Sequence, residues 1–575
     1  MTPTNAEVAQ ALHEIADLLE ISGENRFRIL GYRRVADAVD NLEGGVCEIP
    51  VAELQAIPGV GKALADKIGE FCNTGRIDTL EKLRKQIPVG LLELKNIPGL
   101  GPKKALQLYQ ALGVATVDDL RAAAEAQQIR DVKGFSARFE TEVLAAIEKG
   151  LKTRDRILLA NALPIAREMV ERLQRSPAVQ KAAYAGSVRR YRDTIKDVDL
   201  LVASDRPDEV IDAFRKLPGV VNAKAEGPTK CSVTTTRGMQ VDLRVIEPDV
   251  FGAALQYFTG SASHNVKVRQ HAVRKGFKLS EYGLFDAKTD ERLVAATEEE
   301  VYERLGMQFV PPTMREDRGE VEAALKGELP DVVQLDQIRG DLQSHSTYSD
   351  GKLSVLEMAR AAADRGYAYY AVTDHGPRLT YMNNLGPDEI AAQRKEVATA
   401  NSELGSRVRV LHGIELNIAG DGSLDYPDEI LAGFDICVAS VHSQFKLPKA
   451  EQTKRLITAI RNPHVHVIGH PSGRRLDRRE GIDFDVAAVA REAAKHDVAL
   501  EVNAHPYRLD LRGTHVKWAL DNGAPLVIST DAHSIAELDN MHFGVATAQR
   551  GWATPDRVIN TWPLERLEQF LAKSG

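Results

Sequence analysis

The chain has 575 residues, of which 43% are hydrophobic and 27% charged, and its formal net charge is −8. This length predicts about three to four domains. No run reaches the roughly 18 apolar residues of a membrane span. The N-terminus has neither a basic region nor an apolar signal core, so we expect a cytoplasmic protein. The negative net charge argues only weakly against nucleic-acid binding, because basic residues can cluster locally.

The four cysteines are Cys47, Cys72, Cys231 and Cys437, and none of them lies in CxxC spacing. Scattered cysteines of this kind are typical of a protein in a reducing cytoplasm. The pattern therefore argues against a disulfide framework and against a zinc finger.

A repeated phrase marks the first part of the chain. Residues 5–40 have apolar side chains at helical spacing and predict two helices. The phrase IPGVGK then occurs at 57–62, and IPGLGPKKA occurs at 97–105. Such a repeat predicts two helix-hairpin-helix turns, in which backbone amides at a helix start face a phosphate and lysines add attraction. The expected DNA contacts are Gly59, Gly61, Lys62, Gly99, Gly101, Lys103 and Lys104.

Two helix-joining turns without a ligand are the alternative for these hairpins. A degenerate third copy of the phrase lies at 133–136, where the proline and the second glycine are missing.

Three aspartates follow a glycine-serine turn. A short predicted strand leads into Gly186 and Ser187, and Asp197 and Asp199 then open an apolar run. Because side chains alternate along a strand, both carboxylates face the same way, and Asp242 lies on a later strand that can pair alongside. Converging carboxylates repel one another unless a cation lies between them, and oxygen ligands favour Mg2+ or Mn2+. The pattern indicates metal-assisted phosphoryl transfer, with ordinary surface acids as the alternative.

These residues resemble the nucleotidyltransferase core of X-family DNA polymerases, of which polymerase β is the best-known member. The resemblance continues in the strings YFTGS at 257–261 and SEYG at 280–283. It implies that the three aspartates are catalytic metal ligands. It also implies nucleotide contacts from Gly186, Ser187, Arg190, Tyr257, Phe258, Gly260, Asn265 and Arg269.

The resemblance extends to the N-terminal helices, where X-family polymerases bind the 5′ phosphate across a gap. Lys67 falls at the position of a lysine that can act there as a Schiff-base lyase. Arg28 and Tyr32 match residues of the 5′-phosphate pocket. A second pocket lysine is matched by Ala63, so a lyase and an ordinary exposed lysine are both open interpretations of Lys67.

Beyond residue 340 lie most of the fifteen histidines. Seven apolar runs, each followed by a helix-like segment, predict parallel strands in a closed or nearly closed barrel. The runs lie near 338–342, 368–373, 408–414, 436–441, 465–469, 498–502 and 525–530. Barrel enzymes build their sites where strands end, and six of these runs end on or just before a ligand-type residue.

We therefore expect two or three metal ions held by His345, Asp350, His375, Glu415, His442, His470, Asp531 and His533. Five other histidines are expected to be structural, namely His412, His464, His466, His496 and His505.

The strings around these ligands resemble the PHP (polymerase and histidinol phosphatase) phosphoesterase family. They are SHSTYSDG at 344–351, TDH at 373–375, GIE at 413–415, SVH at 440–442, GHP at 469–471 and TDAH at 530–533. The resemblance implies one metal bound by His345, Glu415 and Asp531, a second by Glu415, His442 and His470, and a third by Asp350, His375 and His533.

The family usually opens with His-x-His, and here the first position is Gln343. An amide oxygen is a weak, hard ligand, so we expect a nuclease that prefers Mn2+ and has one weakly occupied site. The alternative is that Gln343 points away and another group or water completes the site.

Together these features predict a multidomain fold: a helical helix-hairpin-helix region, an α+β nucleotidyltransferase palm and a C-terminal (β/α)7 PHP barrel. The expected parts are an N-terminal helical domain at 1–88, fingers with the second hairpin at 89–155, the palm at 156–248, a nucleotide-binding subdomain at 249–312, a linker or docking arm at 313–337 and the PHP domain at 338–575.

The combined resemblance implies a gap-filling DNA repair polymerase that uses Mg2+ or Mn2+, joined to a 3′-5′ exonuclease or AP endonuclease that uses Mn2+ or Zn2+. Expected partners are gapped DNA with 5′-phosphate ends, primer termini and dNTPs, and the expected state is a monomer. Two alternatives are a polymerase fused to a small-molecule phosphoesterase, and a DNA-end-binding repair scaffold with a weakened nuclease.

Overall fold

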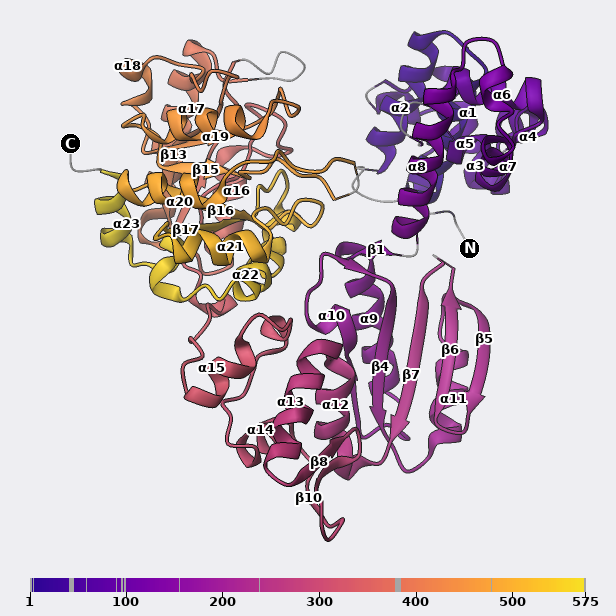
Figure 1. Ribbon diagram of the computed structural model, residues 1–575. Coiled ribbons are helices and arrows are strands. Elements are labelled where there is room, and N and C mark those ends of the chain that lie inside the picture. The colour runs from indigo at the N-terminus through magenta and orange to yellow at the C-terminus, as the bar shows by residue number, and fades with distance from the viewer. Residues whose placement is uncertain are drawn as a thin grey trace. The chain divides into compact units, whose positions relative to one another are not determined.

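The fold was analysed in a computed structural model that describes residues 3–572 except 4, 41–45, 58, 89, 95–96, 98–99, 155, 237, 378–383 and 477. The chain divides into an N-terminal unit, Met1–Asp155, and a C-terminal unit, Arg156–Gly575 (Figure 1). Among the described residues no helix has the length and apolar character needed to cross a bilayer.

The N-terminal unit is built from helices around one core. Its α-helices are α1 (Asn5–Ile21), α2 (Arg26–Asp40), α3 (Lys62–Thr74), α4 (Asp78–Gln86), α5 (Leu91–Leu94), α6 (Pro102–Leu112), α7 (Val117–Glu125) and α8 (Ala137–Arg154). Helices α1 and α2 confirm the prediction for residues 5–40. They bury Leu12, Ile15 and Val35 completely, because apolar residues at helical spacing form one stripe along each helix.

Both predicted hairpins close with the same backbone hydrogen bond. The amide of Val60 donates to the carbonyl of Ile57 at 3.0 Å, and the amide of Leu100 donates to Ile97 at 2.9 Å. Helices α3 and α6 then start directly after Gly61 and Gly101. The degenerate third copy forms an equivalent bond, from Phe135 to Val132 at 3.0 Å, before α8.

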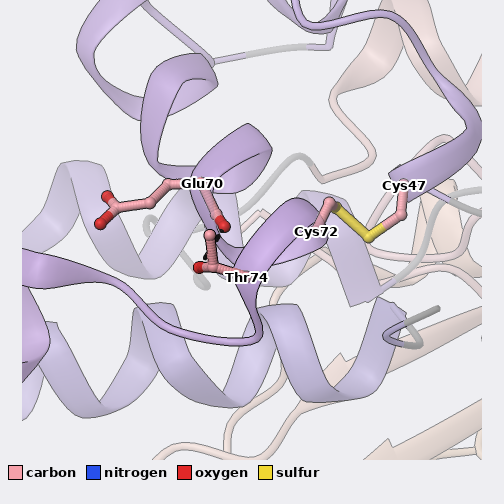
Figure 2. The surroundings of a disulfide bond; sticks show 4 residues. All are labelled: Cys47, Glu70, Cys72 and Thr74. Carbon is pink, nitrogen blue, oxygen red and sulfur yellow. Dashed lines mark hydrogen bonds between the residues drawn. A yellow bond between two sulfur atoms is a disulfide. The ribbon is translucent and has the colours of Figure 1, made fainter. Parts of the chain in front are cut away.

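The expectation that the cysteines stay unpaired is wrong for two of them. Cys47, on the short 3-10 helix η1 (Val46–Glu48), is bonded to Cys72 on α3, with Cα atoms 5.2 Å apart (Figure 2). Twenty-five positions separate the two in sequence, so their spacing gives no sign of this contact. Packing of η1 against α3 creates it. Cys231 and Cys437 are buried, and neither forms a disulfide within the described part of the chain.

The first part of the C-terminal unit is a five-stranded sheet in the order β2-β4-β7-β6-β5. The strands are β2 (Lys181–Tyr184), β4 (Asp197–Ala203), β5 (Val220–Gly227), β6 (Lys230–Thr235) and β7 (Gln240–Ile246). Helices α9 (Leu159–Gln174) and α11 (Pro207–Arg215) pack against it, and the one-turn helix α10 (Gly186–Arg189) forms the predicted glycine-serine turn. Central strands β4 and β7 run parallel, side by side (Figure 1).

The next part begins with two helices, α12 (Phe251–Thr259) and α13 (Ala262–Arg274). A small antiparallel sheet of β8 (Phe277–Ser280), β9 (Gly283–Asp286) and β10 (Arg292–Val294) follows, and then α14 (Glu298–Arg304). The stretch 313–337, expected to be a linker or docking arm, packs onto this subdomain through Met314, Val321 and Ala324 of its core. It carries α15 (Glu320–Lys326) and the 3-10 helix η6 (Leu335–Gln337).

The last part contains seven parallel strands in sequential order. They are β11 (Gly340–Asp341), β12 (Tyr369–Val372), β13 (Arg409–Asn417), β14 (Ile436–Ser440), β15 (Val467–Gly469), β16 (Ala499–Asn503) and β17 (Leu526–Ser529). Each lies at a predicted apolar run. A parallel bridge from Ser344 to Ala532 links the ends of the first and last strands, so the barrel is nearly closed.

Helices cover the outside of the barrel, as βαβ connections require (Figure 1). They are α16 (Val355–Asp364), α17 (Pro387–Leu404), α18 (Asp428–Leu431), α19 (Lys449–Ile460), α20 (Val486–Lys495), α21 (Gly513–Asp521), α22 (Met541–Arg550) and α23 (Leu564–Leu571).

A buried ion pair joins the five-stranded sheet to the helical subdomain. Glu298 accepts hydrogen bonds from Arg189 at 3.0 Å and from the fully buried Arg315 at 2.6 Å. Although burial favours the neutral acid, the two arginines hold the pKa of Glu298 below its usual value. The carboxylate is therefore ionised and balances the buried cation of Arg315 and the half-buried cation of Arg189.

We expect Glu298→Ala to lower the free energy of unfolding of the C-terminal unit by about 3–5 kcal/mol, because the change leaves buried arginines without a counter-charge. Tryptophan fluorescence in a urea titration measures this, since Trp518, Trp552 and Trp562 all lie in that unit. Glu300→Ala, at an exposed position on the same helix, is the control and should change little. Equal stability of the two variants would contradict the role given to Glu298.

Candidate active sites

The three aspartates come together on neighbouring strands. Asp197 and Asp199 lie on β4, and the parallel register sets Asp199 directly beside Asp242 of β7. Both carboxylate oxygens of Asp242 accept hydrogen bonds from Gln240 at 3.0 Å. Burial, followed by the negative charges of its two neighbours, raises the pKa of Asp199 to about 7. A cation would relieve this repulsion, so the donor set fits a divalent metal.

Gly186 is required beside this cluster. Its φ is +59°, and a Cβ atom at this position would lie 2.0 Å from Oδ2 of Asp199. Only glycine can bring the turn so close to the carboxylate without strain.

A pocket of about 610 Å3 opens over these residues. Every residue predicted to contact a nucleotide lines it, and so do two of the aspartates: Gly186, Ser187, Arg190, Tyr257, Phe258, Gly260, Asn265, Arg269, Asp197 and Asp199. Asn265 is fixed at its wall, because it donates to the Tyr257 carbonyl at 2.7 Å and accepts from Gln256 at 2.8 Å.

Sequence reasoning missed several charged residues of the same pocket, namely Arg156, Arg192, Lys196 and Glu316. The first three add positive charge that suits a polyphosphate. Glu316 is the unexpected member, since its carboxylate accepts from Arg190 at 3.1 Å and from Arg192 at 3.1 Å. Arg192 and Lys196 could have been predicted from the run of basic residues at 189–196. Nothing in the sequence places Glu316 beside them.

In the N-terminal unit, Gly59, Lys62, Gly101, Lys103 and Lys104 are exposed around the two hairpins, and Gly61 precedes α3 at the surface. The ammonium of Lys104 also lies 4.4 Å from the ring centre of Phe139. Gly99 lies outside the described residues.

The lyase candidates lie in the same unit. Lys67 is half-buried on α3. Tyr32 is 5% exposed and belongs to the core, and Arg28 is exposed and paired with Glu24 at 2.7 Å.

In the barrel, the predicted ligands meet where the strands end. Glu415 lies at the centre: its carboxylate oxygens are 3.1 Å from Nδ1 of His375, 3.3 Å from Nε2 of His442 and 3.1 Å from Nε2 of His470. Nε2 of His345 lies 3.0 Å from Asp531. All eight ligand-type residues predicted for this half of the chain contribute to the cluster.

Asp350 forms the other side of the cluster. Its Oδ1 atom lies 3.2 Å from Nε2 of His533 and 3.6 Å from Nε2 of His375. The rings of His345 and His533 stack with centres 4.3 Å apart.

Three groups within this cluster have donor atoms close enough to share an ion: His345, Asp350, His375 and His533; His375, Glu415 and His442; and His345, Glu415 and Asp531. Both oxygens of Glu415 and both ring nitrogens of His470 are buried, and none of them has a hydrogen-bond partner among the residues that the structure describes. Burial lowers the pKa of His375 to about 3 and also lowers that of His470, so both rings are in the neutral form that binds metals. The residues therefore fit a cluster of metal ions.

Models of known protein families match four separate parts of the chain. The DNA polymerase beta thumb matches residues 254–316, and the PHP domain matches residues 341–518. A helix-hairpin-helix domain matches residues 3–77, and a SAM-like helix-hairpin-helix tandem matches 91–160. The DNA polymerase/3′-5′ exonuclease PolX of Bacillus subtilis is 39% identical over 570 residues, which is 99% of both chains. The chain belongs to the PolX family, the X-family DNA polymerases with a C-terminal PHP domain.

Two more distant relatives match separate parts of this PolX chain. DNA polymerase lambda of Rattus norvegicus is 27% identical over 351 residues, 55% of the chain and 57% of that protein. A probable phosphatase of Edwardsiella ictaluri is 30% identical over 246 residues, 41% of the chain and 94% of that protein.

In this PolX chain, Gln343 is fully buried, and within the described ranges neither its side-chain oxygen nor its side-chain nitrogen has a hydrogen-bond partner. The amide of Asp531 donates to its carbonyl at 3.1 Å, so Gln343 lies beside the strand that ends in two ligands. An unpartnered buried amide is compatible with a ligand role.

Sequence reasoning missed Glu501 and Asn503, at the end of the one barrel strand for which no ligand was predicted. Glu501 is fully buried, and its Oε2 atom accepts from the backbone amide of His470 at 2.5 Å. Asn503 donates to Asp531 at 3.1 Å. Burial, with the negative charge of Asp531, raises the pKa of Glu501 well above its usual value. The signal was present, since Glu501 and Asn503 share one face of a predicted strand.

The five histidines expected to be structural lie outside the three metal-type groups found among the described residues. His466 accepts from the amide of Cys437 at 3.0 Å, His412 lies 3.1 Å from Gln393, and His496 lies 3.2 Å from Glu492. His464 and His505 belong to none of the three metal-type groups found among the described residues.

We expect Glu415→Gln to reduce the metal bound by the protein to about half or less, because Glu415 contributes a charged oxygen to two of the three groups. Mass spectrometry of metals after equilibration with Mn2+ and gel filtration measures this. Glu403→Gln, an exposed acid on α17 of the same domain, should bind as much metal as the parent. Equal metal content in Glu415→Gln would rule out this glutamate as a ligand.

Proposed function

We propose that this PolX chain is a DNA polymerase that fills short gaps during DNA repair, and that its PHP domain is a metal-dependent 3′-5′ exonuclease that also cuts at abasic sites. The observation that carries the proposal is the pocket lined by Asp197 and Asp199, with Asp242 beside them on the next strand, in a chain that matches a polymerase/exonuclease along 99% of its length. The nucleotide candidates from three separate segments meet at this one pocket, which supports their proposed roles.

Within the pocket we give each residue the role that its match to the X-family polymerases implies. Gly186, Ser187 and Arg190 would bind the triphosphate, because Gly186 and Ser187 begin α10, Arg190 directly follows it, and all three line the pocket beside the carboxylates. Tyr257 and Phe258 would face the sugar, with Gly260 allowing close approach, and Asn265 and Arg269 would contact the base and the template. The aspartates would hold Mg2+ or Mn2+, which stabilises charge on the attacking and leaving oxygens. Asp242 would orient the primer end.

For the PHP domain we propose two or three ions, Mn2+ or Zn2+, held by the eight ligand-type residues around Glu415. When bound, such ions polarise a phosphodiester and activate water. Gln343 would offer an amide oxygen to the group of His345, Glu415 and Asp531, which favours Mn2+. The neutral rings of His375 and His470 suit this role because no proton has to leave before they bind.

The hairpins of the N-terminal unit would bind gapped DNA at its 5′ phosphate, with Lys67, Arg28 and Tyr32 near that end. The lyase role of Lys67 stays a prediction.

We propose the six-part division given by the sequence, a monomeric state and a cytoplasmic location as further parts of this hypothesis.

One observation favours a second candidate for the PHP domain. Probable phosphatases match it along 94% and 93% of their own length. A small-molecule phosphoesterase would hydrolyse histidinol phosphate, whereas the proposed nuclease would hydrolyse labelled DNA in the same Mn2+ buffer.

We expect Asp242→Ala to reduce nucleotide addition by about 10³-fold or more, because it removes a metal ligand from the polymerase site. Hydrolysis of DNA by the PHP domain should survive, since its ligands lie on other strands. Primer extension and degradation on gapped DNA measure the two activities separately. Asp208→Ala, at an exposed position on α11, is the control. Loss of both activities in folded Asp242→Ala would show that the sites are not independent.

We also expect gapped DNA with a 5′ phosphate to bind about tenfold more tightly than the same gap with a 5′ hydroxyl, because backbone amides and lysines bind a dianion. Fluorescence anisotropy at moderate salt measures both affinities. Replacing Lys62, Lys103 and Lys104 by alanine should reduce the difference, while Lys85→Ala in the same unit should keep it. Equal affinity for the two DNAs would show that the hairpins do not bind the 5′ phosphate.

A further inference from the structure

The last residue of helix α22 in the PHP domain reaches the polymerase part of the chain. The guanidinium of Arg550 donates to the backbone carbonyl of Arg190 at 2.9 Å and to the carboxylate of Glu316 at 3.3 Å. Arg550 is 5% exposed, and its own carbonyl accepts from Arg318 at 3.4 Å. A side chain of one domain is therefore buried against the nucleotide pocket of the other.

Glu316 is the meeting point of these contacts. Its carboxylate accepts hydrogen bonds from Arg190 and Arg192 of the polymerase pocket and from Arg550 of the PHP domain. Burial opposes ionisation, but the charges of the three arginines hold the pKa of Glu316 below its usual value. The acid is ionised and is shared among three cations.

The hydrogen bond to Glu316 matters because the guanidinium of Arg190 already donates to two acceptors within the protein. Its Nε atom donates to Glu316, and its Nη1 atom donates to the carbonyl of Thr259. A triphosphate that binds Arg190 has to compete with the carboxylate of Glu316, since both are anions. A second cation beside Glu316 neutralises part of its negative charge. Glu316 then competes more weakly with the triphosphate for Arg190.

We infer that Arg550 is a positioning residue of the polymerase site: it shares the carboxylate of Glu316 with Arg190, which weakens the hold of Glu316 on that arginine, and it fixes the backbone of Arg190, so that the PHP domain supports binding of the incoming nucleotide. The inference rests on the proposed role of Arg190 in binding the triphosphate. It gives the PHP domain a part in polymerisation that does not depend on its own metal cluster.

The contact is separate from the packing that holds the two domains together. Leu509 and Phe543 of the PHP domain pack into the core of the palm sheet, and Arg474 pairs with Asp193 at 3.0 Å. Gln549, beside Arg550, donates to the carbonyl of Val333 at 2.8 Å. Removal of the Arg550 charge therefore leaves most of the interface in place.

The test is Arg550→Met in the full-length protein, with KM and kcat for dNTP measured in single-nucleotide gap filling at saturating DNA. We expect KM to rise about tenfold, the size of one hydrogen bond to a charged group, and kcat to stay within about twofold because the aspartates are untouched. DNA hydrolysis by the same preparation should match the parent. Arg550→Lys restores the charge beside Glu316 and should recover most of the lost affinity.

Gln549→Ala is the matched control, because it loosens the same interface one residue away without touching Glu316. Its KM for dNTP should equal that of the parent. If both variants raise KM and lower kcat alike, Arg550 acts only through domain packing and the inference is wrong. If Arg550→Met does not fold, Arg550→Gln keeps a donor for the Arg190 carbonyl but lacks the charge, and the same rise in KM is expected.

Arg190→Ala separates this inference from the proposed function. If that change raises KM while Arg550→Met and Arg550→Gln leave it unchanged, the nucleotide site stands and the role of Arg550 is refuted. If Arg190→Ala leaves KM unchanged, the assignment of Arg190 fails, and the inference built on it fails too.

Discussion

Balancing buried negative charge is the constraint on which both sites of this protein depend. In the palm, Asp199 lies beside two other carboxylates, and burial together with their repulsion raises its pKa to about 7. In the barrel, Glu415 is fully buried, and nearby histidines hold its pKa well below the usual value despite the burial. Carboxylates gathered in this way are stable only beside cations, so each cluster is built to receive metal ions.

The pairing of strands decides where these charges meet. Parallel register sets Asp199 of β4 beside Asp242 of β7, although forty-three positions separate them in the sequence. In the barrel, sequential parallel strands bring Glu415, His442 and His470 to one end, because every strand runs in the same direction. Strand pairing therefore sets the positions of the ligand-type residues in both sites.

The polymerase and PHP parts are joined by side-chain contacts as well as by the chain between them. Residues 313–337 pack on the subdomain before them, and buried charged groups on both sides of the interface contact one another. Arg474 binds Asp193, and Arg550 binds Glu316 beside the nucleotide pocket. Buried ion pairs of this kind are specific in geometry, since a misplaced partner leaves a charge uncompensated. This is the physical basis on which a side chain of the nuclease domain can influence nucleotide binding.

Much of the fold and of both candidate sites could be predicted from the sequence. The alternation of apolar runs and helical segments gave all seven barrel strands, and ligand-type residues at the strand ends gave the eight members of the metal cluster. Asp197 and Asp199 could be placed on one face because a strand has period two.

Only the tertiary structure decided the contacts between distant segments. The Cys47–Cys72 bond, the place of Glu501 behind the metal ligands and the three arginines around Glu316 join residues whose local sequence carries no trace of their partners. Strand and helix periods are local properties of the chain, so the sequence determined the elements and the residue types at their ends. Buried charge pairs and disulfides depend on how those elements pack, and that packing decided them.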